Sequence, residues 1–104
     1  MKKHKMYVIV RDDISKSYQA AQGGHALAQM ALDWPEAFQE WHNGTIVYLK
    51  TSYEDLVQIT TSFDLCEKGC VWTDWYEPDI GDDLTAISVY GLSAEDYFKN
   101  YKLL

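Results

Sequence analysis

The sequence predicts one α/β domain over residues 1–104, with a four-stranded mixed sheet and helices packed on it. A chain of 104 residues has room for one hydrophobic core. Hydrophobic residues make up 47% of the chain, which is typical of a globular domain. Strand-like and helix-like segments follow one another in the order βαβαββα, in which right-handed crossovers join parallel strands.

Four segments have the composition of strands. The first, KMYVIV, is β-branched and aromatic, and Arg11 with two aspartates closes it. The turn Asn43-Gly44 leads into the second. The expected strands are Lys5 to Val10, Thr45 to Lys50, Cys70 to Tyr76 and Leu84 to Tyr90.

The first helix is expected from Ser17 to about Asp33. Its spacing predicts that a face of small residues packs on the sheet, namely Ala20, Gly24, Leu27 and Ala31. Glycine costs roughly 1 kcal/mol against alanine inside a helix, so Gly23 and Gly24 indicate a close approach of the backbone to the sheet.

Three further helical segments complete the predicted elements. The segment PEAFQEWH after Trp34 predicts a short helix. Ser52 and Asp55 resemble a capping box, and the helix they start should continue past Phe63 until Gly69. Ser93 and Asp96 predict a terminal helix through YFKNYKLL.

Charge excludes several classes of partner. The sequence has nine basic and sixteen acidic residues, which gives a net charge of -7, and Arg11 is its only arginine. Broad binding of a phosphate backbone needs a basic surface, so tRNA is a poor partner, whereas a small anion is not excluded.

The sequence lacks an apolar run of the roughly 18 residues that a membrane span needs, and its start does not read as a signal peptide. We expect a cytoplasmic protein without a membrane partner.

We expect neither a metal nor a cofactor. Cys66 and Cys70 have no second cysteine pair and read as reduced, partly buried thiols. The acidic residues between Asp74 and Asp83 lack the spacing of a calcium loop and read as a solvated turn.

The candidate site lies where the first strand ends and the first helix begins. Ligands of α/β sheets gather beyond the carboxyl ends of strands, where helix N–H groups are unpaired. Arg11, Lys16 and the hydroxyls of Ser15 and Ser17 supply donors there, and one helical stripe holds Tyr18, Gln22, His25 and Gln29. The alternative is a solvated helix face with Ser15 or Ser17 as its N-cap.

These residues carry a resemblance to a known family. The segment SYQAAQGGHA after the strand YVIVRDD resembles the G-K-x-A-A-Q-x-x-H-A signature of the type 2 peptidyl-tRNA hydrolases. Asp74 matches the family's strand-end aspartate, and LTAISVYG and YKLL resemble its closing strand and C-terminus. The resemblance implies that family's fold and, as activity, hydrolysis of the ester between a peptide and tRNA.

Two departures from the family pattern weaken the implied activity. The family's lysine position is Tyr18, and a phenol cannot replace an ammonium ion in stabilising an oxyanion. Pro78 and Asp79 stand where the family has threonine and glutamine. Gln22, His25 and Asp74 match, and they would be the site residues of a hydrolase. We therefore expect no catalytic residues.

Aromatic residues gather around the predicted strand ends, namely Tyr18, Trp72, Trp75 and Tyr76. Alternation on the third strand predicts that Trp72, Asp74 and Tyr76 share one face. Rings stack on a nucleobase, and Asp74 or Glu77 would accept hydrogen bonds from it, while the first-turn amides from Ser15 to Ser17 and Arg11 would hold a phosphate. Core and rim packing is the alternative role of Trp72 and Trp75.

The resulting expectation is a non-catalytic protein that binds a small nucleotide. Its small size suggests a phage-type protein that sequesters a cyclic dinucleotide or a related immune signal. A peptidyl-tRNA hydrolase is the alternative, and a protein-interaction module using the exposed aromatic residues is the third. Four tryptophans and eight tyrosines also predict a homo-oligomer, most simply a dimer.

Overall fold

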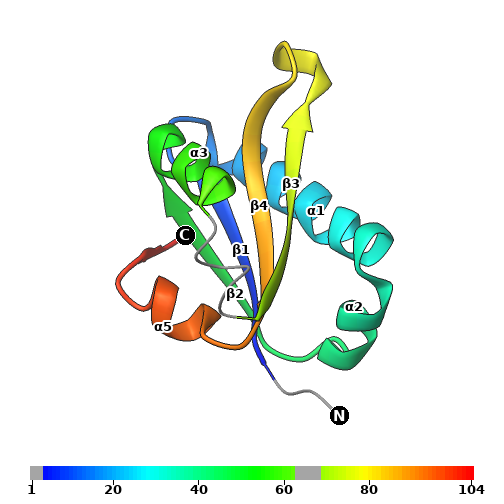
Figure 1. Cartoon of the computed structure of the whole chain (residues 1–104). Coiled ribbons are helices and arrows are strands. Elements are labelled where there is room, and N and C mark those ends of the chain that lie inside the picture. Colours follow the sequence, from blue (N-terminus) through cyan, green and yellow to red (C-terminus); the bar gives the residue numbers. More distant parts are fainter. Residues whose placement is uncertain (1–3, 63–68) are drawn as a thin grey trace.

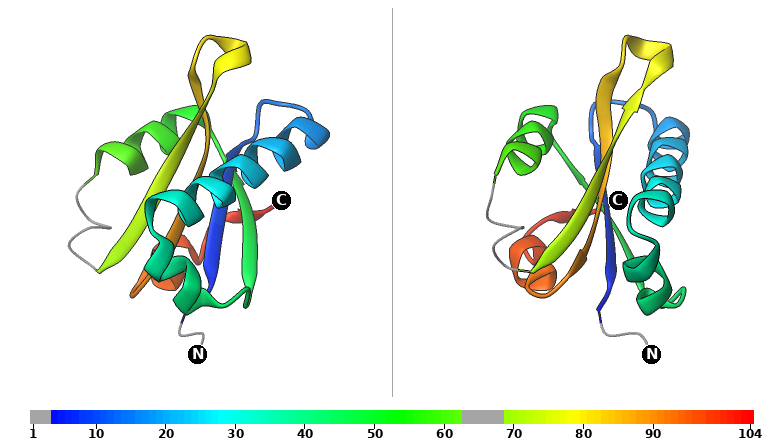
Figure 2. Two further views of the ribbon diagram at one scale, coloured as in Figure 1. Left: turned by 90° about the vertical axis from the view of Figure 1, so that its right-hand side faces the viewer. Right: turned by 45° about the vertical axis from the view of Figure 1, so that its right-hand side comes forward.

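The computed structural model describes residues 4–62 and 69–104, which form a sheet with helices on both faces (Figures 1 and 2). The elements in chain order are β1 (Met6–Arg11), α1 (Lys16–Asp33), α2 (Pro35–Trp41), β2 (Ile46–Thr51), α3 (Tyr53–Thr61), β3 (Cys70–Glu77), the 3-10 turn η1 (Pro78–Ile80), β4 (Asp83–Gly91), α5 (Ala94–Phe98) and β5 (Lys102–Leu103). The α/β class is confirmed.

The sheet has five strands in the order β3-β4-β1-β2-β5, one more than predicted. Strands β1 and β2 are parallel, and every other neighbouring pair is antiparallel. Helices α1 and α2 cover one face, and α3 and α5 cover the other (Figure 2). Each of the four predicted strands is present within one residue of its expected bounds.

The predicted C-terminal helix is wrong in its second half. Helix α5 ends at Phe98, and Ser93 has φ 72° and makes no side-chain cap. The chain instead returns along β2 as β5, pairing Leu103 with Leu49. The N–H of Leu104 donates to the Tyr48 carbonyl over 3.0 Å. An open strand edge offers backbone partners that a helix in this position would leave unused.

The two remaining helices follow the expected signals. Helix α2 begins at the proline after Trp34. The Ser52 hydroxyl caps α3 by accepting from the Asp55 N–H over 3.1 Å. Helix α3 ends at Thr61, and Phe63 and Cys66 lie outside the described residues.

Each face of the sheet has its own hydrophobic core. The core on the α3 side includes Ile9, Leu56 and Phe98, and the core on the α1 side includes Val8, Met30 and Trp41. Cys70 is buried, and its thiol donates to the Leu92 carbonyl. Within residues 4–62 and 69–104, no helix has the length and apolar character to cross a membrane.

The predicted packing face of α1 is wrong at two of its four positions, whereas Leu27 packs against the core and Ala31 is partly buried. Ala20 and Gly24 are exposed. The buried residues of the helix are Gln19, Gln22, Gly23, Ala26 and Met30. This face of α1 can be buried against the sheet because side chains of the sheet form hydrogen bonds with its polar groups. For example, the Ser88 hydroxyl donates to the Ala26 carbonyl over 2.9 Å.

The two adjacent glycines of α1 differ in their surroundings. A Cβ at Gly23 would lie 2.6 Å from the Tyr48 hydroxyl oxygen, whereas a Cβ at Gly24 would meet nothing within 4 Å. The close approach expected from the glycine pair is therefore confirmed at Gly23 alone.

We expect Gly23→Ala to lower the free energy of unfolding by about 1–2 kcal/mol, because overpacking against Tyr48 outweighs the gain in helix propensity. Gly24→Ala is the matched control and should stabilise by up to about 1 kcal/mol. Urea denaturation of both variants measures the difference. In a Tyr48→Leu background Gly23→Ala should cost less, and an equal cost in both backgrounds would contradict this explanation.

Candidate functional site

The start of α1 is held in place by side chains of the predicted site. Ser15 is the N-cap and accepts from the Tyr18 N–H over 3.3 Å. The hydroxyls of Ser15 and Ser17 lie 3.5 Å apart. The Gln19 amide donates to the Arg11 carbonyl over 2.9 Å, which ties the helix to the end of β1. Ser15 therefore has the capping role that the alternative interpretation gave it.

Arg11 is engaged by its own neighbours. It donates to both carboxylate oxygens of Asp13, over 2.8 and 2.7 Å, and to the Leu84 carbonyl over 3.3 Å. Its guanidinium lies 4.6 Å from the Tyr53 ring centroid and 3.7 Å from the Asp83 carboxylate. Hydrogen bonding to Asp13 raises the Arg11 pKa, and the side chain is 14% exposed. The geometry does not support the expected phosphate contact of Arg11, because a second anion would have to displace these partners.

Four predicted residues lie together where α1 packs beside the end of β3. The rings of His25 and Trp75 are stacked, with centroids 4.6 Å apart and planes inclined by 17°. The Trp75 indole donates to Glu77 over 3.2 Å. Loss of hydration is the main cause that raises the Tyr18 pKa, and the nearby carboxylates of Glu77 and Asp79 raise this pKa further. We call Tyr18, His25, Trp75 and Glu77 the ring surface.

Gln22 does not belong to the ring surface. It is 1% exposed, and its carbonyl accepts from the Thr85 hydroxyl over 2.8 Å. In the ladder between β3 and β4, Trp75 faces Ala86 and Tyr76 faces Leu84, so Thr85 is the extra residue of a β-bulge. The predicted stripe is therefore broken, and Gln22 has a structural role inside the domain.

Strand alternation separates Asp74 and Tyr76 from the ring surface. Trp72 packs against the core on the α3 side, whereas Trp75 packs against the core on the α1 side. Asp74 and Tyr76 lie on the same side as Trp72. Burial is the main cause that raises the Tyr76 pKa, and the neighbouring Asp74 and then Tyr53 raise this pKa further. The shared face predicted for Trp72, Asp74 and Tyr76 is therefore confirmed, whereas the grouping of Asp74 with Gln22 and His25 is wrong.

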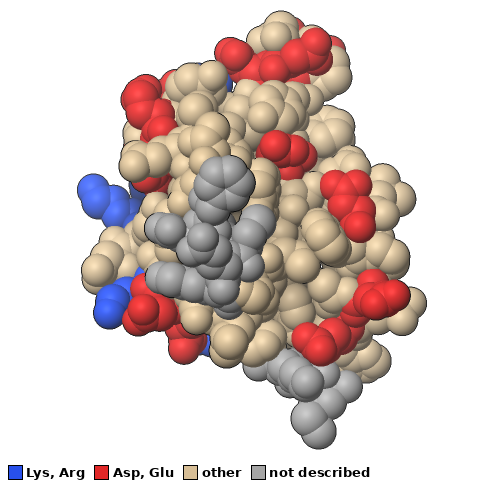
Figure 3. All heavy atoms as spheres, viewed as in Figure 1, with Lys and Arg blue, Asp and Glu red and all other residues tan. Residues whose placement is uncertain are grey.

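Carboxylates dominate the end of the sheet near the ring surface. Red atoms crowd the top of Figure 3, where the hairpin between β3 and β4 carries Asp79, Asp82 and Asp83. Among the described residues no group of three or more His, Cys, Asp or Glu side chains is arranged to hold a metal ion. A ligand here would meet negative potential, which favours hydrogen-bond donors over anions.

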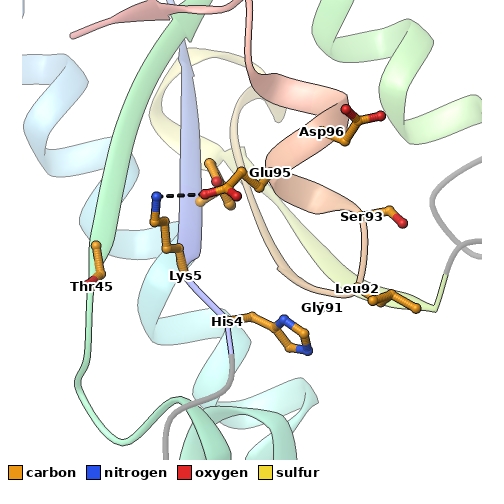
Figure 4. A pocket seen from close by; sticks show the side chains of 9 residues that line it. His4, Lys5, Thr45, Gly91, Leu92, Ser93, Glu95 and Asp96 are labelled. Atoms are coloured by element: carbon orange, nitrogen blue, oxygen red, sulfur yellow. Dashed lines mark hydrogen bonds and ion pairs between the residues drawn. The ribbon is translucent and has the colours of Figure 1, made fainter.

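A separate hollow of about 460 Å³ lies at the opposite end of β1 (Figure 4). Its wall includes His4, Lys5 and Glu95, and the Lys5 ammonium contacts the Glu95 carboxylate over 2.6 Å. Hydrogen bonding to Glu95 raises the Lys5 pKa. This hollow contains none of the predicted site residues.

Comparison with known proteins supports the fold alone. No protein-family model matches the chain, and no curated protein matches it either. A solved structure of a protein of unknown function from Agrobacterium tumefaciens is similar, with a TM-score of 0.66 and 14% sequence identity. The alignment covers 100% of this chain and 99% of that one. At this identity the likeness concerns the architecture.

We expect Thr85→Val to lower the free energy of unfolding by about 1–3 kcal/mol, because it leaves the buried Gln22 carbonyl without its donor. Urea denaturation measures the loss. Thr61→Val, on the exposed side of α3, is the control and should change stability by less than about 0.5 kcal/mol. Adding Gln22→Met to Thr85→Val should recover part of the loss, since both polar partners are then removed. Equal effects at Thr85 and Thr61 would contradict the structural role of Gln22.

The pairing of Asp13 with Arg11 predicts a dependence on pH. Hydrogen bonding to Arg11 lowers the Asp13 pKa, so the carboxylate stabilises the fold above its unfolded pKa of about 3.9. This contribution is lost as pH falls through the folded pKa. Asp13→Asn should cost at most about 1 kcal/mol at pH 7, because Asp13 is half exposed. The cost should vanish at low pH, when the wild-type carboxyl is protonated.

Denaturation at a series of pH values tests this coupling. The neighbouring Asp12→Asn removes the same charge and is the control, and it should show a smaller change with pH. A cost of Asp13→Asn that stays constant down to pH 2 would show that the ion pair is not its source.

Proposed function

We propose that this chain is a non-catalytic protein that binds a small nucleotide through its ring surface. The observation that carries the proposal is the stack of His25 on Trp75 beside Glu77. The imidazole is exposed, so a planar base extends the stack on its outer face. Glu77 lies beside the stack, and its negative charge favours a base whose edge carries N–H groups.

Glu77 supports selectivity for a base that donates hydrogen bonds. Its side chain is 7% exposed and is already oriented by the Trp75 indole N–H. A carboxylate fixed in this way acts on the base through its charge, and it loses little freedom when a ligand binds. The carboxylates around the ring surface disfavour a ligand whose charge lies next to the base.

The proposal includes a scaffold shared with the type 2 peptidyl-tRNA hydrolases. The matching segment SYQAAQGGHA lies in α1, directly after β1, as the family pattern requires. Catalysis is not part of the proposal, because Tyr18 brings no ammonium group and Asp74 lies on the α3 side of the sheet. A phosphate would meet the hydroxyls of Ser15 and Ser17 at the exposed first turn of α1. A cyclic dinucleotide is one ligand of this class, and assembly into a homo-oligomer stays a prediction.

Calorimetric titration with nucleosides and nucleotides tests the ring surface, guided by the mass spectrum of small molecules released on heating the protein. His25→Ala should weaken binding by about 5- to 150-fold, the equivalent of one lost stacking contact of about 1–3 kcal/mol. Gln58→Ala, on exposed α3 across the sheet, should leave affinity unchanged. Equal affinities of these two variants, or no binding tighter than about 100 µM across the panel, would overturn the proposal.

An assay on peptidyl-tRNA tests the non-catalytic part. We expect no turnover above the uncatalysed rate. Turnover on the order of 1 s⁻¹ that Asp74→Ala abolishes would establish hydrolysis in place of nucleotide binding.

A further inference from the structure

Two lysines face each other across β2 and β5. Lys50 and Lys102 are register partners, so their side chains leave the same face of the sheet. Like charges directly opposite in an antiparallel pair destabilise the pair. Among the described residues no carboxylate lies within the 4.0 Å ion-pair distance of either lysine. Lys50 and Lys102 thus form a repulsive pair that no carboxylate of residues 4–62 and 69–104 neutralises.

Both lysines line a hollow of about 600 Å³ whose wall also includes Ser52 and Tyr101. A second hollow of about 410 Å³ adjoins it, because Lys50 lines both, and Lys16 at the start of α1 lines the second one. Such volumes match those of small-molecule sites. We call Lys16, Lys50 and Lys102 the lysine crevice.

The topology of the sheet places the lysine crevice at a favourable position for a ligand. The parallel strands β1 and β2 end here, and the chain leaves β1 for α1 on one face and β2 for α3 on the other (Figures 1 and 2). Connections that diverge in this way leave a crevice beyond the carboxyl ends of the strands, where ligands of α/β sheets bind.

Two carboxylates, those of Asp12 and Asp55, also line the larger hollow. Asp55 already accepts from the Thr51 hydroxyl over 3.0 Å and from the Tyr101 hydroxyl over 2.7 Å. Asp12 is exposed to solvent. Lys50 pairs with Val10, a residue of the core on the α1 side, so the side chains of Lys50 and Lys102 leave the sheet on the face opposite to Asp55. The smaller hollow, which includes Gln19 of α1, is lined by two of the lysines, Lys16 and Lys50. In Figure 3 most blue atoms lie on the left flank, with red atoms beside them, whereas the right flank carries red atoms alone.

We propose that the lysine crevice binds a small polyanion, of the class that carries two adjacent phosphate groups. Lysine binds phosphate as a point charge, and a diphosphate bridging Lys50 and Lys102 removes the repulsion between them. The partner is small because a longer phosphate backbone would meet the acidic hairpin at the same end of the sheet. The site needs no base and does not depend on the ring surface.

Calorimetric titration with inorganic pyrophosphate at about 50 mM salt tests the crevice. The variant Lys50→Gln/Lys102→Gln should bind at least about tenfold more weakly than the wild type. The matched control is Lys5→Gln/Lys99→Gln, which removes two lysines paired with Glu95 and Asp96 and leaves the net charge of the two variants equal. The control should bind within about twofold of the wild type.

Two further measurements keep the outcomes separate. Amide chemical shifts on adding pyrophosphate should change at residues 50–52 and 101–103, and thermal unfolding should show that Lys50→Gln/Lys102→Gln is at least as stable as the wild type. His25→Ala should leave pyrophosphate affinity unchanged, so failure of the nucleotide proposal would not affect this one. No saturation by about 10 mM pyrophosphate, or equal weakening in both double variants, would overturn the lysine crevice.

Discussion

Helix α1 is held to the sheet by a row of buried polar contacts at close range. Gln19 bonds to the Arg11 carbonyl, Gln22 to Thr85, and Ser88 to the Ala26 carbonyl. Gly23 lets the backbone come near Tyr48. These contacts have directional geometry, so they fix the rotation of the helix more tightly than an apolar stripe would. The rotation in turn exposes Tyr18 and His25, and it places His25 over Trp75.

The sequence predicts the element order well and the packing face of α1 poorly. Alternation and capping signals are local, which is why β1 to β4 and the start of α3 agree with expectation. Glutamines on a helix usually indicate solvent, and nothing local marks Gln19 and Gln22 as partners of the sheet. Strand β5 could not be predicted from local signals either, because it forms by pairing with the open edge of β2, which is far away in the sequence.

The candidate site shows the same limit. Nearness in sequence brings Arg11, Asp74 and Tyr76 into one predicted cluster with Tyr18 and His25, yet the sheet divides them between its faces. Arg11 looks available in the sequence because its contacts to Asp83 and Leu84 come from a distant strand. Lys50 and Lys102 carry no local signal, because only the pairing of β2 with β5 makes them neighbours.

The bulge at Thr85 has a consequence for how the molecule behaves at high concentration. Strand β3 is an edge strand, and its outer backbone is a template on which another chain could add. A bulge bends its strand and increases the local twist, and beyond it the hairpin of β3 and β4 projects past the helices (Figure 2). A twisted edge next to the hairpin residues Asp79, Asp82 and Asp83 is a poor surface for a second strand, so we expect the bulge that anchors Gln22 also to oppose edge-to-edge aggregation.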